Sequence, residues 1–92
     1  MFEIVLSNQF RRDLKLAKKR GLKIEKLKKV VDTLASGHKL DEKYRDHKLI
    51  GEYGIKGFRE CHIEPDWLLI YRVDKSVLEL YLFRTGTHSD LF

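Results

Sequence analysis

The first third of the chain passes from an alternating to a helical spacing of apolar residues. Residues 2–6 carry apolar side chains at alternate positions, which predicts a strand. Two helices are expected next, one ending at about Arg20 and one over residues 23–35, with Ser7 or Asn8 capping the first. Because only a short Gly-Leu connection separates them, they should form an antiparallel hairpin. The expected buried stripes are Phe10, Leu14 and Ala17 in the first helix and Leu27, Val30, Val31 and Leu34 in the second.

The second half contains three further strand patterns. They cover residues 57–63, 67–73 and 77–83. The first alternates, whereas the other two are almost entirely apolar, as a central strand would be. The turns between them, residues 64–66 and 74–76, are short, so the three strands should form an antiparallel meander. The polar segment 38–53 is expected to be a loop with a short extended piece around His47.

Together these elements predict one α+β domain over residues 1–92, in the order β-α-α-β-β-β. We expect the helical hairpin to pack on one face of a small, mostly antiparallel, twisted sheet and the other face to be free for function. No apolar run approaches the roughly 20 residues that span a bilayer, and the N-terminus does not resemble a signal peptide. The single Cys61, expected to be a small core residue, cannot form an internal disulfide, so a cytoplasmic location without membrane contact is expected.

The charge is distributed unevenly. The net charge is +5, yet residues 1–30 hold ten Lys and Arg against three Asp and Glu, and residues 31–92 hold nine against eleven. A basic first third suits a polyanion or an acidic protein partner. The alternative is a pair of solvated helix faces with no partner.

The last third gathers the residue types that cleave RNA without a metal. Histidine has a free pKa of roughly 6.5 and therefore exchanges protons near neutral pH. RNA carries its own nucleophile, the 2′-OH, so an enzyme needs only a base, an acid, a cation for the phosphate and a surface that orients the base. The candidates there are His62, Asp66, Trp67, Arg84, His88 and Phe92, and His47 from the preceding loop is added to them.

These residues lie in segments that resemble the RelE/YafQ toxins of type II toxin–antitoxin systems, most closely the YafQ branch. The resemblance covers nearly the whole chain and is carried by residues 15–20, 44–49, 58–67 and 83–88, followed by Leu91-Phe92. Members are ribosome-dependent mRNA endonucleases inhibited by an antitoxin encoded beside them. The loop 51–57 looks longer than in relatives, so no codon preference is carried over.

The resemblance implies a role for each residue of the proton-transfer set. His88 is expected to be the general acid and His47 or His62 the general base, while Asp66 orients an imidazole or shuttles a proton. Arg84 is expected to clamp the phosphate with its planar fork. The expected products are a 2′,3′-cyclic phosphate and a 5′-hydroxyl, with no cofactor and no metal.

The resemblance also implies binding residues and partners. Trp67 and Phe92 are expected to stack on nucleobases, which contributes about 1–3 kcal/mol per base. Lys18 and Lys19 are expected to bind the phosphate backbone of ribosomal RNA. The expected partners are mRNA in the ribosomal A site, ribosomal RNA and a cognate antitoxin with a flexible, partly acidic C-terminal segment. DNA would be bound only by the toxin–antitoxin complex.

Three other hypotheses fit parts of the pattern. A ParE-like toxin shares the architecture and acts on a topoisomerase without cleaving RNA, but such proteins generally lack this set of acid–base residues. A plain RNA-binding module would not need His88. A zinc site from three histidines and an aspartate is weakly indicated, because no pair has tight ligand spacing.

Overall fold

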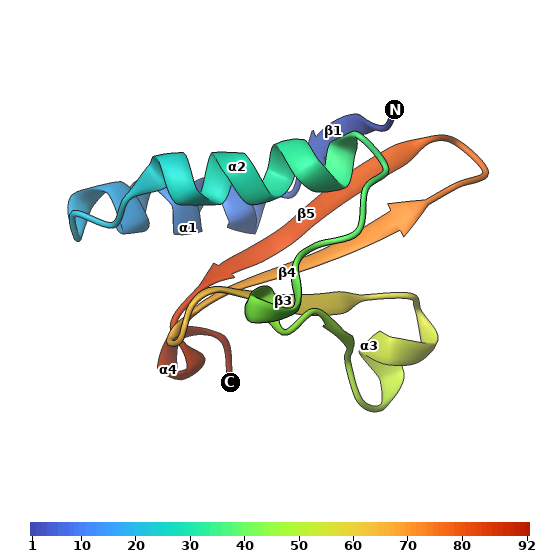
Figure 1. The fold of residues 1–92 in the computed structure, drawn as a ribbon. Helices are drawn as coiled ribbons and strands as arrows, with labels where there is room; N and C mark the ends of the chain where they lie inside the picture. Colours follow the sequence, from blue (N-terminus) through green and yellow to red (C-terminus); the bar gives the residue numbers. More distant parts are fainter.

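A five-stranded sheet with a helical hairpin on one face forms the frame of the molecule (Figure 1). The computed structural model describes all residues, 1–92. The elements are β1 (Glu3–Leu6), α1 (Asn8–Lys19), α2 (Ile24–Ala35), the 3₁₀ turn η1 (Glu42–Tyr44), β2 (His47–Lys48), α3 (Glu52–Ile55), β3 (Arg59–Glu64), β4 (Trp67–Asp74), β5 (Glu79–Gly86) and α4 (His88–Leu91). None of the helices combines the length and the apolar composition that a membrane span requires.

The strand order in the sheet is β1-β5-β4-β3-β2. The β1 strand runs parallel to β5, and every other pair is antiparallel, so the predicted meander and mostly antiparallel sheet are confirmed. The short extended piece predicted around His47 is β2, which pairs with β3 at the sheet edge. This order brings residues 47, 62 and 88, far apart in the chain, toward one end of the sheet.

The local signals for the hairpin are confirmed. Ser7 caps α1, because its Oγ accepts the Phe10 N–H at 2.9 Å and donates to the Phe83 carbonyl at 2.6 Å. After α1 the chain turns at Gly21, whose φ of +77° lies in the left-handed region that favours glycine. The apolar stripe of α2 is buried as predicted, while Leu14 of α1 is only half-buried against the core.

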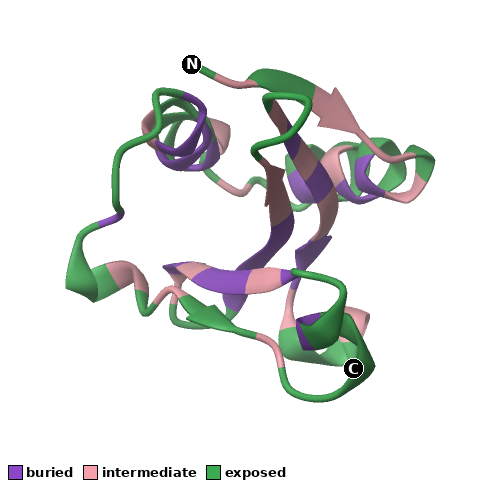
Figure 2. Cartoon of the chain, turned by 90° about the vertical axis from the view of Figure 1, so that its right-hand side faces the viewer, coloured by how far each residue is buried: buried purple, intermediate pink, exposed green.

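The core lies between the hairpin and the sheet (Figure 2). Strand β4 is buried from Trp67 to Tyr71 without interruption, which agrees with its continuous apolar pattern. Cys61 is fully buried, and burial raises the pKa of its thiol, so the prediction that it is a core residue is confirmed.

Three features differ from the sequence-based expectations. The short helices α3 and α4 were not predicted. The last strand, predicted from residue 77, begins at Glu79, because Val77 and the exposed Leu78, with a φ of 54°, belong to the preceding turn. The sheet face opposite the hairpin is also not free throughout. Over part of it Tyr53 of α3 packs edge-on against Phe58, with 5.8 Å between ring centroids.

Candidate functional site

Three of the four histidines meet at one end of the sheet. The ring centroids of His47 and His62 are 6.3 Å apart, and those of His62 and His88 are 5.8 Å apart. They come from β2, β3 and α4, so only the folded chain brings them together. The fourth histidine, His38, is exposed in the loop after α2 and belongs to no such contact. We call the three residues His47, His62 and His88 the histidine cluster.

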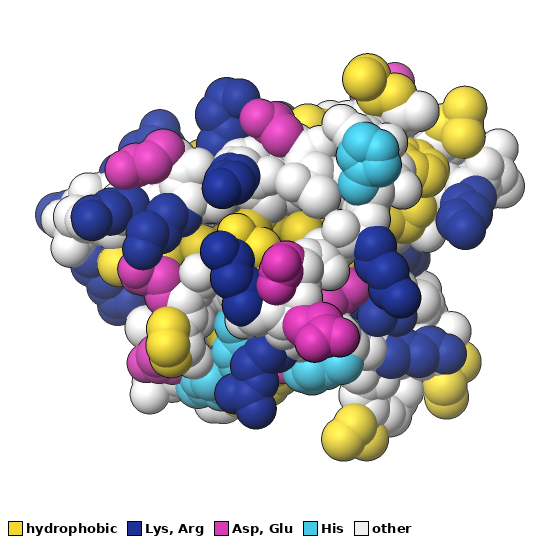
Figure 3. All heavy atoms as spheres, viewed as in Figure 1, with side chains coloured by type: hydrophobic (Ala, Val, Ile, Leu, Met, Phe, Trp, Pro, Cys, Tyr) yellow, Lys and Arg dark blue, Asp and Glu magenta, His cyan; other side chains and the backbone are white.

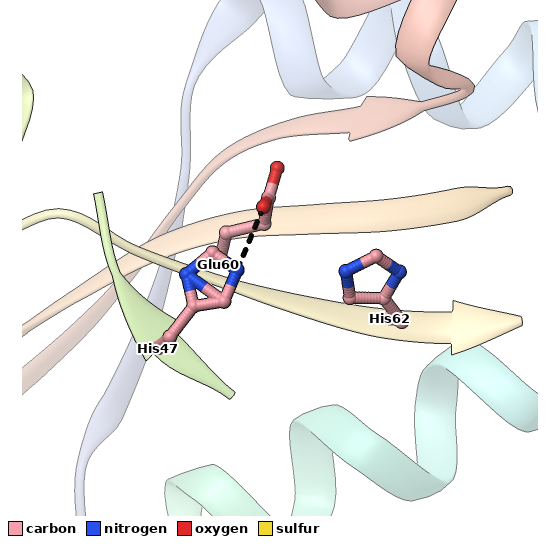
Figure 4. Close-up of side chains that lie close together, drawn as sticks. All are labelled: His47, Glu60 and His62. Carbon is pink, nitrogen blue, oxygen red and sulfur yellow. Dashed lines mark ion pairs between the residues drawn. The ribbon is translucent and has the colours of Figure 1, made fainter. Parts of the chain in front are cut away.

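Strand pairing places the first two members. His47 lies opposite Glu60 in the β2–β3 register, and His62 follows two positions along β3. Because side chains alternate across a strand, Glu60 and His62 share a face, while Cys61 and Ile63 point into the core. Figure 4 shows the Glu60 carboxylate at the His47 ring and the His62 ring beside them along β3.

Glu60 is a site residue that the sequence analysis missed. Its carboxylate Oε2 lies 3.1 Å from His47 Nε2, and its side chain is almost fully buried. The other nitrogen of His47, Nδ1, faces the Lys48 carbonyl at 3.3 Å. Both neighbours are acceptors, so both contacts are hydrogen bonds only when His47 is the doubly protonated imidazolium. The alternation of β3 was the signal that places Glu60 beside His62.

His62 differs from His47 in that only one of its ring nitrogens has a protein partner. Its Nδ1 faces the Pro65 carbonyl oxygen at 3.3 Å, in the turn before β4. A carbonyl only accepts, so this contact is a hydrogen bond when Nδ1 carries the proton. In the neutral ring the lone pair is then on Nε2, which has no protein partner. This is the geometry of a proton acceptor.

His88 is held by Asp66. The Asp66 carboxylate oxygen Oδ1 accepts both the His88 backbone N–H, at 3.0 Å, and a hydrogen bond from His88 Nδ1, at 2.6 Å. The backbone hydrogen bond, followed by that from the side chain, lowers the pKa of Asp66 below its ordinary value. An anionic Asp66 therefore fixes the ring so that Nε2 is the nitrogen available to a substrate.

Local structure explains how His88 reaches this position. It is the first residue of α4, and Thr87 caps that helix through a capping box with Asp90. Asp90 also forms an ion pair with Arg20 at the end of α1, at 2.7 Å. The hydrogen bond from Arg20 is the largest cause that lowers the pKa of Asp90 to about 2. The C-terminal turn is thus stabilised by its own capping box and by an ion pair with the helical hairpin.

Arg84 does not offer a free fork to phosphate, contrary to the sequence-based expectation. Its Nε and Nη2 donate to the two carboxylate oxygens of Asp13, at 2.8 and 3.1 Å. Asp13 is buried on α1 and also accepts the backbone N–H of Thr85 at 3.1 Å. Arg84 therefore joins α1 to β5. An acidic residue on the apolar side of α1 was the signal for this pair.

The two aromatic residues predicted to stack on bases have different environments. Trp67 is 2% exposed, and its Nε1 donates to Thr85 Oγ1 at 2.9 Å, so it belongs to the core and stacking on a base is excluded. Phe92 is 72% exposed and lines a cavity of about 410 Å³ beside His47 and Glu60. The structure therefore brings Phe92, and not Trp67, to the histidine cluster.

The two predicted RNA-binding lysines lie outside this cluster. Lys18 and Lys19 are exposed on the last turn of α1, where cations also complement the helix dipole. Neither forms an ion pair, so both ammonium groups are free to meet a polyanion.

Part of the cluster has the composition of a metal site. Ligand atoms of His47, Glu60 and His62 all lie within 4.8 Å of one another. Two imidazoles and a carboxylate are a donor set that suits zinc and other divalent transition metals. The predicted set of three histidines and an aspartate is not what the structure assembles, because Asp66 is committed to His88.

With this geometry described, the comparisons with known proteins decide the family. Residues 2–92 match the family described as "Bacterial toxin of type II toxin-antitoxin system, YafQ". The chain belongs to the YafQ toxin family. It is 42% identical over 91 residues to the mRNA interferase toxin YafQ of Escherichia coli K12, covering 98% of this chain and 95% of that protein. The resemblance predicted from the sequence is therefore confirmed.

Solved structures of the family have the same fold. A metal-bound toxin from Helicobacter pylori superimposes with a TM-score of 0.93 at 46% identity, covering 100% of both chains. A chain of the E. coli DinJ–YafQ complex gives a TM-score of 0.91 at 41% identity, covering 100% of this chain and 99% of that one. The predicted α+β, RelE-like architecture is thus confirmed.

Proposed function

We propose that this toxin is an mRNA endoribonuclease that acts on the ribosome and cleaves by acid–base catalysis with its own side chains. The observation that carries the proposal is the histidine cluster, in which one imidazole is poised to accept a proton and a neighbouring one is held by a carboxylate. The E. coli relative is an mRNA interferase, which supports the same substrate. A ParE-like toxin that only binds a partner would have no use for this arrangement.

The proposed reaction uses His62 as the base. Its Nε2 removes the 2′-OH proton, and the 2′-oxygen attacks the adjacent phosphorus. The bond from phosphorus to the 5′-oxygen breaks, and His88 Nε2–H protonates that oxygen, giving a 2′,3′-cyclic phosphate and a 5′-hydroxyl. Asp66 stabilises the His88 imidazolium that donates this proton. Each such proton transfer contributes about 10²–10⁴-fold to the rate.

The remaining groups have supporting roles in this proposal. The His47 imidazolium, held by Glu60, replaces Arg84 as the cation beside the crowded phosphorane. Phe92 stacks on a nucleobase next to the scissile bond. Lys18 and Lys19 contact ribosomal RNA through its phosphates, while the mRNA lies in the A site.

A metal-dependent reaction is the second candidate, because one specific observation favours it. The H. pylori relative of known structure is metal-bound, and His47, Glu60 and His62 here suit a divalent ion. An ion bound there would supply an activated water or hydroxide. It would also be held by a ring nitrogen of His62, so the two candidates make opposite predictions for a chelator.

The toxin is also proposed to have a cognate antitoxin. The E. coli relative forms a complex with DinJ, which supports this expectation. The basic first third of the chain suits the acidic C-terminal segment expected of such a partner. DNA binding would then belong to the complex, and the toxin would act in the cytoplasm.

The deciding experiment is cleavage of a defined mRNA, with and without ribosomes, followed by mapping of the new ends. His88→Ala should lose at least about 10²-fold in rate, whereas the control His38→Ala should cleave like the parent protein. A chelator selective for transition metals, which leaves ribosomal magnesium in place, should not change the rate.

The outcomes separate the candidates. Cleavage that needs ribosomes and disappears in His88→Ala supports the proposal. Cleavage abolished by the chelator and restored by zinc supports the metal-dependent candidate. No cleavage by the folded parent protein in either mixture contradicts both, and leaves a toxin that acts by binding.

A further inference from the structure

A second concave surface adjoins the histidine cluster and shares only His62 with it. It is a groove of about 430 Å³ between α2 and the segment 43–45. Its polar lining residues are Lys26, Lys29, Lys43, Tyr44, Arg45, His62 and Glu64. We call it the basic groove. Figure 3 shows Lys and Arg side chains spread over the helices and also around the histidines on this side of the molecule.

Most of the positive charge in the basic groove is uncompensated. Lys26 pairs with Glu64, the only acidic lining residue, at 2.8 Å. The ammonium groups of Lys29 and Lys43 and the guanidinium of Arg45 have no carboxylate within 4.0 Å. Lys29 comes from α2, whereas Lys43 and Arg45 come from η1 and its end, and the fold makes all three line one concavity.

The other arginines near the site are already committed. Arg20 pairs with Asp90, Arg59 with Asp46, and Arg84 with Asp13. With Arg84 occupied, the phosphates that flank a scissile bond need another source of positive charge. Among the arginines near the histidine cluster, Arg45 is the one whose guanidinium has no carboxylate partner.

The backbone holds Arg45 in place. Its φ of 50° lies in the left-handed region, an unusual conformation for a residue with a side chain. It ends η1, and its N–H donates to the Glu42 carbonyl at 2.9 Å. On the other side Asp46 is anchored, because its carboxylate accepts from Tyr71 Oη at 2.6 Å and from Arg59. An uncommon backbone conformation beside an anchored neighbour marks Arg45 as a candidate functional position.

We propose that the basic groove binds the backbone of single-stranded RNA next to the scissile phosphate, with Lys29 and Arg45 each contacting a phosphate. This inference rests on the proposed function, because His62 belongs both to the groove and to the histidine cluster. An RNA strand bound in the groove would therefore contact His62. Tyr44, half-buried against the core with the Lys43 ammonium 5.2 Å from its ring centre, also lines the groove.

The substitutions that test this keep the local structure. The groove variant combines Lys29→Gln and Arg45→Asn. Lys29→Gln removes the charge and keeps most of the side-chain stem. Arg45→Asn also removes the charge, and asparagine tolerates the left-handed backbone. The control is the double variant Lys28→Gln and Lys75→Gln, which removes the same charge from exposed positions outside the groove. Thermal unfolding of both double variants verifies that they are folded.

The measurement is the affinity for a fluorescent single-stranded RNA, 2′-O-methylated throughout so that it cannot be cleaved, over a range of KCl concentrations. Each phosphate contact on a single strand contributes about 0.7 to the slope of log affinity against log salt, so the groove variant should lose about 1.4. The control variant should keep the parent slope. An unchanged slope in the groove variant, or a parent protein whose RNA affinity does not depend on salt, overturns the proposal.

A second measurement separates this inference from the proposed function. On ribosomes programmed with mRNA, the groove variant should need a higher toxin concentration for half-maximal cleavage and should keep the rate at saturation. A parent protein that cleaves, together with an unchanged RNA slope, contradicts only the groove. If the changed slope is found in a protein that never cleaves, the groove stands and the proposed function fails. Loss of antitoxin affinity with an unchanged RNA slope would assign the groove to the antitoxin.

Discussion

Two acidic residues near the end of β5 are used in opposite ways. At the hairpin side, Asp13 is buried and its two oxygens receive three hydrogen bonds from Arg84 and Thr85, so it joins helix to sheet. At the histidine side, Asp66 is exposed and holds a single exposed imidazole. Buried pairs strongly affect stability when one partner is removed, whereas exposed pairs contribute little. Stability and chemistry should therefore be separable by mutation.

The largest effect should come from the base. His62→Gln is expected to reduce cleavage by about 10²–10⁴-fold with little change in the melting temperature, because the side chain is not in the core. The pH profile should also lose its acidic limb, since the base must be unprotonated to act. Rates measured from pH 5 to 9 by single-turnover cleavage would test this. If His47→Gln removes that limb instead, the base is His47.

Breaking the buried Asp13–Arg84 pair should reduce stability and leave the chemistry intact. Asp13→Asn keeps the shape but leaves Arg84 without its charge partner, and should destabilise the fold by about 3 kcal/mol. Urea unfolding followed by circular dichroism would measure the loss. Cleavage per folded molecule should stay near the parent value; a fall of 10²-fold or more would show that Arg84 and Asp13 belong to the chemistry.

A matched pair of aromatic substitutions sharpens the comparison. Trp67→Phe removes the buried hydrogen bond to Thr85 and should cost about 1–3 kcal/mol of stability while sparing the catalytic rate of the folded protein. Phe92→Ala should weaken RNA binding by about 1–3 kcal/mol and leave the melting temperature unchanged. Thermal unfolding and RNA affinity, measured on both variants, would test the pair. The reverse pattern would restore Trp67 as a substrate residue.

The smallest effect concerns the C-terminal turn. The pKa of Asp90 is lowered from its ordinary 3.8 to about 2, so its contribution to stability is present above pH 4 and is lost as the pH falls toward 2. Asp90→Asn should lower the melting temperature slightly at pH 7, and the difference from the parent should shrink over this range. Calorimetry at several pH values would measure it. A difference that persists at pH 2 would mean that the carboxylate charge is not its source.

Periodicity alone predicted most of the frame, because repeating apolar spacing reports which face of an element is buried. It could not predict α3, which is too short to have a repeat. The other short helix, α4, did carry a signal. Thr87 followed by Asp90 is a capping box with aspartate at its third position, and this pattern predicts a helix start.

The sequence by itself determined the two long helices, the main strands, the order of the meander and the presence of proton-transfer residues, because these depend on neighbours along the chain. Only the tertiary structure decided their use. It buried Trp67, paired Arg84 with Asp13, added Glu60 to the site and set His62 between His47 and His88. Each of these depends on contacts between residues distant in the chain, and spacing along a sequence does not encode such distances.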